Sequence, residues 1–266
     1  MFKKLFVVLA GLSCFQSTCS LFAQNVNDVV KVSQILETSK QPNLTAPALE
    51  QLSQFIETGL WDKLPQSARE RASLAFLKQL KYGCHIAEIG ESAEANKHMK
   101  LLSVIAVKIR DMRTIPILID GLNGHYRNAL VKIGEPALPY LVHRFGDNTM
   151  AGTGTGKSAI LEVFKRMGTA KIKNKNLIAV KQVLIKAAND NDVYVRRRAL
   201  DVFGELGDEL DIPLIEKIKN NDTGFFEVDS ASDGGKSHGK QKKFIVREEA
   251  SKALEKIKSR GGLRSQ

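Results

Sequence analysis

The sequence predicts an all-α fold, a solenoid of antiparallel helix pairs. Four copies of one twelve-residue pattern end at positions 134, 168, 207 and 258, and the first three end on a glycine. In each copy, apolar residues recur at i, i+3, i+4 and i+7, which places them on one face of a helix. The ends are 34, 39 and 51 residues apart, which is typical of repeat proteins. No stretch alternates apolar and polar residues at length, so strands should be few.

The four copies predict the second helix of each pair. They read NGHYRNALVKIG (123–134), KSAILEVFKRMG (157–168), RRRALDVFGELG (196–207) and REEASKALEKIK (247–258). The apolar columns together hold sixteen side chains, which we expect to be buried where neighbouring helices stack. The glycine that ends each of the first three copies is expected to adopt the left-handed conformation that stops a helix.

A further helix is predicted before each copy. These first helices occupy residues 113–122, 135–145, 176–188 and 211–220. Pro116, Pro139 and Pro213 stand near their starts, where a missing backbone N–H costs little. Each unit of the solenoid is therefore a pair of helices.

The segments before the repeats are amphipathic but lack the pattern. They cover residues 26–38, 46–60 and 67–82. Because the terminal repeat of a stack needs one face that is not apolar, we expect an N-terminal helical cap over residues 24–96. The repeats then occupy residues 97–260, beginning with a helix at 97–112, and residues 261–266 form a flexible tail.

An export signal is predicted at the N-terminus. Two lysines precede an apolar run over residues 5–15, and a small residue, Ala23, follows a polar stretch. The run is too short to span a bilayer. We expect a signal peptide over residues 1–23 and a periplasmic or secreted mature chain with no transmembrane segment. Two alternatives are lipid anchoring at Cys14 and a buried N-terminal helix.

Composition and cysteine content limit the classes of function that the chain can have. The chain has 266 residues, 43% hydrophobic and 26% charged, with a formal net charge of +11. This is a globular composition whose charge favours acidic partners. Cys84 is the only cysteine beyond the predicted signal, so the mature chain cannot form an internal disulfide. The adjacent pair Cys84 and His85 lacks the further ligands that a metal site needs.

Parts of the chain resemble HEAT repeats of the short bacterial kind, also called phycobilisome-lyase-type HEAT-like repeats. The resemblance is carried by residues 129–142, 195–207 and 246–257, and it extends over about residues 97–260. It implies a right-handed α-α superhelix with a curved inner surface that binds other molecules.

Repeats of this family commonly open their second helix with Val-Arg after an acidic turn. Arg196 and Arg247 fit that rule, whereas Asn123 and Lys157 depart from it. The resemblance implies that Arg196 pairs with an acidic residue of a neighbouring repeat. Its neighbours on the same helix, Arg197 and Arg198, point in other directions. We expect Arg197 or Arg198 to be available on the surface.

Residues 151–158, AGTGTGKS, satisfy a relaxed phosphate-loop pattern. That chemistry requires a strand before the loop and a helix after it. Here the loop follows a predicted helix, and Lys157 occupies the column that holds Arg196 and Arg247. A nucleotide- or phosphate-binding enzyme is therefore the least favoured alternative.

The residues that carry out catalysis in other HEAT-like proteins have no counterparts in this sequence. Deoxyhypusine hydroxylases hold iron with His-Glu pairs, but none of the five histidines here is followed by glutamate. Bilin lyases act inside cells, which the predicted signal argues against. No nucleophile-elbow pattern is present. We expect no catalysis, no cofactor and no metal.

The last repeat contains a polar insertion at residues 221–243. Ten basic and three acidic residues lie between Lys236 and the C-terminus. An anionic protein, envelope polymer or lipid could bind this segment, and the alternative is a solvated basic tail. The candidate binding residues on the chain are Arg197, Arg198, Phe225, Phe226, Lys236, Lys240, Lys242 and Lys243.

These observations favour an exported, non-catalytic protein-protein interaction scaffold whose partner is acidic. The alternative is a binder of an anionic envelope polymer or lipid through the basic C-terminal segment. No motif for specific nucleic-acid recognition is present, so we expect none.

Overall fold

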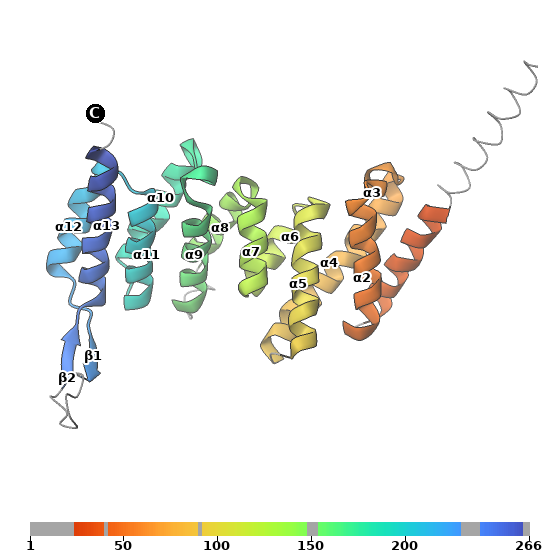
Figure 1. The fold of residues 1–266 in the computed structure, drawn as a ribbon, viewed down its shortest axis with the longest axis horizontal. Helices are drawn as coiled ribbons and strands as arrows, with labels where there is room; N and C mark the ends of the chain where they lie inside the picture. The colour runs from red at the N-terminus through yellow and green to blue at the C-terminus, as the bar shows by residue number, and fades with distance from the viewer. Residues whose placement is uncertain (1–23, 40–41, 90–91, 148–153, 230–239, 263–266) are drawn as a thin grey trace, which may run out of the picture. The chain divides into compact units, whose positions relative to one another are not determined.

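The computed structural model describes residues 24–39, 42–89, 92–147, 154–229 and 240–262. These residues are helical apart from one two-stranded β-hairpin, which confirms the all-α prediction (Figure 1). The predicted signal with Cys14, and residues 263–266 of the predicted tail, lie outside the described residues. In the described part of the chain, no helix combines the length and the apolar character that a membrane crossing requires.

The chain divides into two compact units, residues 1–129 and 130–266. The elements of the first unit are a helix over residues 24–38, α2 (Pro42–Glu57), α3 (Leu60–Lys63), α4 (Gln66–Ile89), α5 (Ala93–Ile109), α6 (Thr114–Gly121) and the start of α7 (Gly124–Ile133). α5 packs against both α2 and α4, and α6 packs against α4. Leu52, Phe76 and Leu102 are fully buried in this core. The amphipathic segments of the sequence therefore form helices as predicted, with shifted ends.

The second unit consists of helix pairs and the hairpin. Its elements after α7 are η1 (Glu135–Ala137), α8 (Leu138–Gly146), α9 (Gly154–Lys171), α10 (Asn174–Ala188), α11 (Val193–Leu206), η3 (Glu209–Asp211), α12 (Ile212–Asn221), β1 (Phe226–Asp229), β2 (Lys240–Lys243) and α13 (Ile245–Gly262). α11 lies between α9 and α13 in one layer, and α10 and α12 pack against α11 and α13 (Figure 1). Pro139 and Pro213 lie in the first turns of α8 and α12, as predicted.

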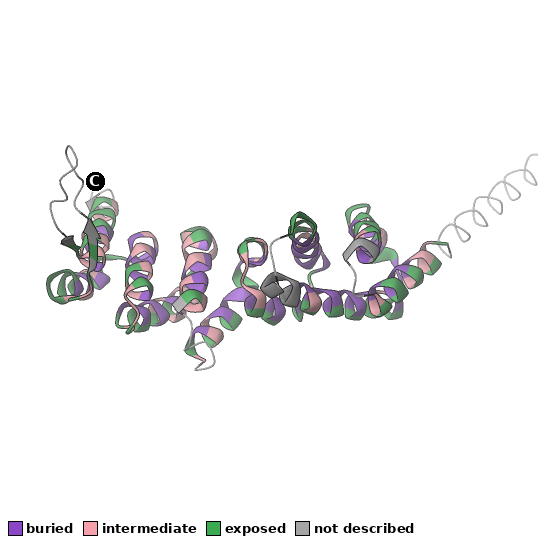
Figure 2. Ribbon diagram, turned by 90° about the horizontal axis from the view of Figure 1, so that it is seen from below, coloured by how far each residue is buried: buried purple, intermediate pink, exposed green. Residues whose placement is uncertain are grey.

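The predicted apolar stripe forms the packing surface of the second helices. Fifteen of its sixteen side chains are buried, and only Ile133 is half-buried. Phe164 and Phe203 are fully buried large side chains of α9 and α11. Burying a side chain of this size contributes about 1.5–3 kcal/mol. Buried residues lie where helices meet and exposed residues lie on their outer sides (Figure 2).

The glycines that follow the stripe do not all act as predicted. Gly134 and Gly168 have positive φ angles of 75° and 56°. Gly207 has φ −71°, so the prediction of a left-handed residue at this position is wrong. A Cβ atom at Gly207 would lie 2.5 Å from the Phe203 carbonyl oxygen and 2.9 Å from Ile257 Cδ1. The Phe203 carbonyl oxygen of the same helix and the Ile257 side chain of α13, rather than a positive φ, leave room only for glycine here.

Candidate interaction surface on α9, α11 and α13

Arg196, near the start of α11, ties this helix to the next pair. Its Nε and Nη2 atoms donate to the Asp222 carboxylate at 2.7 and 3.2 Å, in a side-on arrangement that uses both oxygens. Nη1 donates to the carbonyl oxygens of Asp190 and Asn191 at 2.9 and 3.0 Å. The expected pairing of Arg196 with an acidic residue of a neighbouring repeat is confirmed.

The same repeat position carries a cation in α9 and in α13. Lys157 Nζ lies 2.6 Å from the Asp190 carboxylate, in the turn before α11. Arg247 Nε donates to the Asp222 carbonyl oxygen at 2.6 Å. All three cations of this column therefore contact the turns that begin at Asp190 and Asp222. Turn carboxylates that bind such cations fix the register between successive helix pairs.

Lys157 thus has a structural partner. Burial alone would raise the pKa of Asp190, but hydrogen bonds from Lys157 and from the Asp192 N–H outweigh burial and lower this pKa. The described element before α9 is helix α8 and not a strand. Residues 151–153 of the phosphate-loop pattern lie outside the described residues. The described part of the pattern begins a repeat helix.

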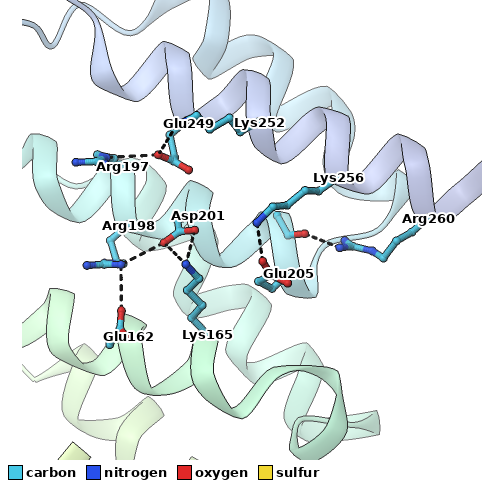
Figure 3. A network of polar contacts seen from close by, with 11 residues as sticks. Glu162, Lys165, Arg197, Arg198, Asp201, Glu205, Glu249, Lys252, Lys256 and Arg260 are labelled. Atoms are coloured by element: carbon cyan, nitrogen blue, oxygen red, sulfur yellow. Dashed lines mark hydrogen bonds and ion pairs between the residues drawn. The ribbon is translucent and has the colours of Figure 1, made fainter. Parts of the chain in front are cut away.

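Charged side chains connect α9, α11 and α13 across their exposed side (Figure 3). Arg198 Nη1 lies 3.0 Å from Glu162 of α9 and 3.2 Å from Asp201 of its own helix. Lys165 of α9 reaches the same Asp201 carboxylate at 2.9 Å. We call this group, together with the α11–α13 contacts described next, the charged ladder.

Contacts between α11 and α13 continue the charged ladder. Arg197 Nε lies 3.4 Å from Glu249, and Lys256 Nζ lies 2.6 Å from Glu205. The hydrogen bond that Lys256 donates to Glu205 raises the pKa of Lys256. Arg260 donates to the carbonyl oxygens of Gly204 and Gly207 at 2.5 and 2.9 Å.

The charged ladder has more basic than acidic side chains. Its basic members are Lys165, Arg197, Arg198, Lys252, Lys256 and Arg260, and its acidic members are Glu162, Asp201, Glu205 and Glu249. The net excess is two positive charges. Carboxylates and, for Arg260, backbone carbonyl oxygens hold the basic groups in place without neutralising the surface, so it attracts anionic partners.

Arg197 and Arg198 both have carboxylate partners on adjacent helices, Glu249 and Glu162. Sequence spacing along α11 could not reveal those neighbours. Both arginines are still accessible, with 49% and 39% of their side-chain surfaces exposed. With Ser158, Tyr194 and Asp201 they line a shallow pocket of about 220 Å³. They bind carboxylates already, yet they face solvent.

The polar insertion contains a β-hairpin that was not predicted. β1 and β2 pair antiparallel, with Phe226 opposite Lys243 and Asp229 opposite Lys240. These strands, FEVD and KQKK, are mostly polar, so the apolar pattern that identifies a strand is absent. The hairpin extends from the start of α13 (Figure 1).

An aromatic and cationic cluster closes the base of the hairpin. The rings of Phe225 and Phe244 lie 5.8 Å apart. Lys242 Nζ lies 4.3 Å from the centre of the Phe225 ring, and the Arg247 guanidinium lies 4.6 Å from that of Phe244. Such contacts contribute about 0.5–1 kcal/mol each when exposed. Phe244 and Arg247 were not predicted to join this cluster, because the insertion separates them from Phe225 in the sequence.

The remaining predicted binding residues have different positions. Lys243 is exposed and lies 3.7 Å from Glu248. Lys240 and Phe226 belong to the strands, but their side chains are not among those described, and Lys236 lies outside the described residues. The structure therefore brings Phe225, Lys242 and Lys243 together at the hairpin and places Arg197 and Arg198 on α11.

In the described ranges, no three His, Cys, Asp or Glu side chains lie close enough to hold a metal ion. Comparison with known proteins finds no family model that matches the chain and no curated protein with significant similarity. The candidate surface is therefore defined by its own geometry: three adjacent repeat helices that share a row of accessible, net positive side chains.

Proposed function

We propose that this chain is an exported HEAT-like repeat protein, a right-handed superhelical scaffold that binds another protein without catalysis. The observation that supports it is the charged ladder, in which consecutive second helices present side chains on one continuous surface (Figure 3). Repeat proteins bind partners over such extended surfaces.

The charged ladder favours an acidic protein partner. Arg197 and Arg198 are held by carboxylates of other helices, so little side-chain freedom is lost when a partner binds them. Arginine also binds a carboxylate through two parallel hydrogen bonds. The carboxylates of an acidic partner would either displace the carboxylates that now bind these arginines or bind the arginines beside them.

The test is binding by the mature chain and two double variants that lose the same charge. Proteins captured from the envelope of the exporting cell are identified by mass spectrometry, and the purified partner is titrated by calorimetry. Arg197→Gln with Arg198→Gln is expected to weaken binding at least tenfold. The control, Lys175→Gln with Lys186→Gln, removes two exposed charges from α10 and is expected to bind normally. Equal affinities for the two double variants would contradict the proposal.

Export has its own test. The chain recovered from the periplasm or the medium is expected to begin at Gln24, which an intact-mass measurement resolves. A form that begins at a lipid-modified Cys14 would support the anchored alternative. A full-length chain in the cytoplasm would contradict export.

A second candidate function is binding of an anionic envelope lipid or polymer by the hairpin. It is favoured by the exposed Lys242 beside the ring of Phe225 and by the exposed Lys243 that follows it, since a basic residue next to an aromatic ring suits an anionic interface. Co-sedimentation with phosphatidylglycerol vesicles, but not with phosphatidylcholine vesicles, would support it. Binding that survives Lys242→Gln with Lys243→Gln would exclude the hairpin.

A further inference from the structure

A pocket of about 350 Å³ opens in the first unit where the start of α4 meets the end of α5. Trp61 and Ile109 give it an apolar wall, and both side chains are largely buried. Arg69 and Ser73 of α4 line another side. These two residues are one helical turn apart, so they lie on the same face of α4.

Arg69 and Ser73 bring hydrogen-bonding groups to this pocket. The Nε atom of Arg69 is buried, and neither it nor the rest of the guanidinium has a partner among the described residues. Ser73 is 6% exposed, and it lines the same pocket. Buried polar groups are nearly always paired, so the unpaired Nε–H of Arg69 in this pocket indicates a bound acceptor.

The other charges of the pocket are already engaged with one another. Arg113 lies 2.7 Å from both the Glu70 and the Asp111 carboxylates. The hydrogen bonds to Asp111 and Glu70 raise the pKa of Arg113, which keeps its charge. Arg69 is thus the cation of this pocket whose counter-ion is missing from the described residues. With Arg69 the two arginines and two carboxylates of the pocket sum to zero, so no excess positive charge favours a ligand with several negative charges.

We propose that this pocket binds a ligand with a single carboxylate group and an apolar body. Arg69 Nε–H and the Ser73 hydroxyl group donate to the carboxylate, and the body lies beside Trp61 and Ile109. Side-on hydrogen bonding of a guanidinium to a carboxylate is the strongest pairing that Arg69 can form. The carboxylate could belong to a free organic acid or to the end of a peptide chain. The proposal involves only the first unit and is independent of the charged ladder.

Trp61 is the only tryptophan of the chain, so its fluorescence reports on this pocket alone. The probes are N-acetyl-L-phenylalanine and its amide, which has a similar shape without the charge. The acid is expected to change the emission saturably and to bind at least tenfold more tightly than the amide. The same comparison with acetyl-Ala-Ala-Phe, as free acid and as amide, distinguishes the sources. Tighter binding of this peptide acid indicates a chain terminus, and equal binding indicates a small acid.

Variants assign the effect to the proposed groups. Arg69→Gln is expected to abolish the preference for the acid, and Ser73→Ala to weaken acid binding several-fold. The matched control is Arg71→Gln on the same helix, because Arg71 pairs with Glu37 outside the pocket and its loss leaves binding unchanged. Circular dichroism verifies that each variant is folded. No saturable response to the acid, equal affinity for acid and amide, or an Arg69→Gln variant that keeps the preference would each overturn the proposal.

Discussion

Replacing Arg196 by alanine is expected to destabilise the second unit far more than replacing its neighbour Arg197. Arg196 donates four hydrogen bonds, and its side chain is 16% exposed. Among the described residues, its partner Asp222, which is 8% exposed, would then keep only the Gly224 N–H, 2.8 Å away, as a donor to its carboxylate. Arg197 forms one contact at 3.4 Å and is half exposed.

The structure sets the size of the difference. Removing one partner of a buried ion pair costs about 3–5 kcal/mol, because the remaining charge is buried without compensation. The Gly224 N–H and partial solvent access moderate this cost at Asp222, so we expect about 3 kcal/mol for Arg196→Ala. An exposed pair contributes about 0.2–1 kcal/mol, which is the expected loss for Arg197→Ala.

Urea unfolding followed by circular dichroism measures both variants. For an unfolding slope of about 2 kcal/mol per molar, the midpoint of Arg196→Ala should fall by about 1.5 M. Arg196→Lys should fall in between, because lysine cannot bind both carboxylate oxygens and the turn carbonyls together. Midpoints of Arg196→Ala and Arg197→Ala that agree within error would refute the reasoning, since it rests on the difference in burial.

Three further predictions concern other parts of the chain. Lys157→Ala should lower the free energy of unfolding by about 1–3 kcal/mol. It should not change the binding of labelled ATP. If the unmodified chain binds ATP and the variant does not, residues 151–158 act as a phosphate-binding loop after all. Burial lowers the pKa of His98 from its usual 6.5, and both ring nitrogens lack partners among the described residues. The unfolded chain therefore binds the extra proton first, so stability is lost as the pH falls below about 6.5, and His98→Leu should flatten this part of the stability profile between neutral and mildly acidic buffer. Phe244→Ala should loosen the hairpin by about 0.5–1.5 kcal/mol, seen as faster proteolysis within residues 226–243 at unchanged helix content; equal cleavage rates would show that the ring pair does not hold the strands.

The helices could be predicted from the sequence because the residue pattern that indicates a helix is local. The stripe through Phe164, Phe203 and Leu254 recurs at helical spacing, and such periodicity needs no knowledge of the neighbours. Prolines near helix starts were equally readable, since the cost of a missing N–H depends on position within the helix.

Features that depend on contacts between distant residues were not predictable in the same way. Gly207 looked like the other glycines of its column, but the space left by the Phe203 carbonyl oxygen and the distant Ile257 side chain, rather than a positive φ, requires glycine there. Glu249 of α13 and Glu162 of α9 pair with Arg197 and Arg198, and no spacing within α11 reveals these two partners, unlike Asp201 at i+3 from Arg198. The pocket beside Trp61 likewise joins α3, α4 and the end of α5, which share no motif.

Amide hydrogen exchange of the second unit tests most directly whether the second helices form one layer. Because α11 is packed on both sides, by α9 and α13, its central amides should open only with global unfolding and exchange most slowly. The β1 and β2 amides should exchange orders of magnitude faster, since a two-stranded hairpin is only marginally stable by itself. Exchange in α11 as fast as in the hairpin would contradict the side-by-side packing on which the proposed binding surface depends.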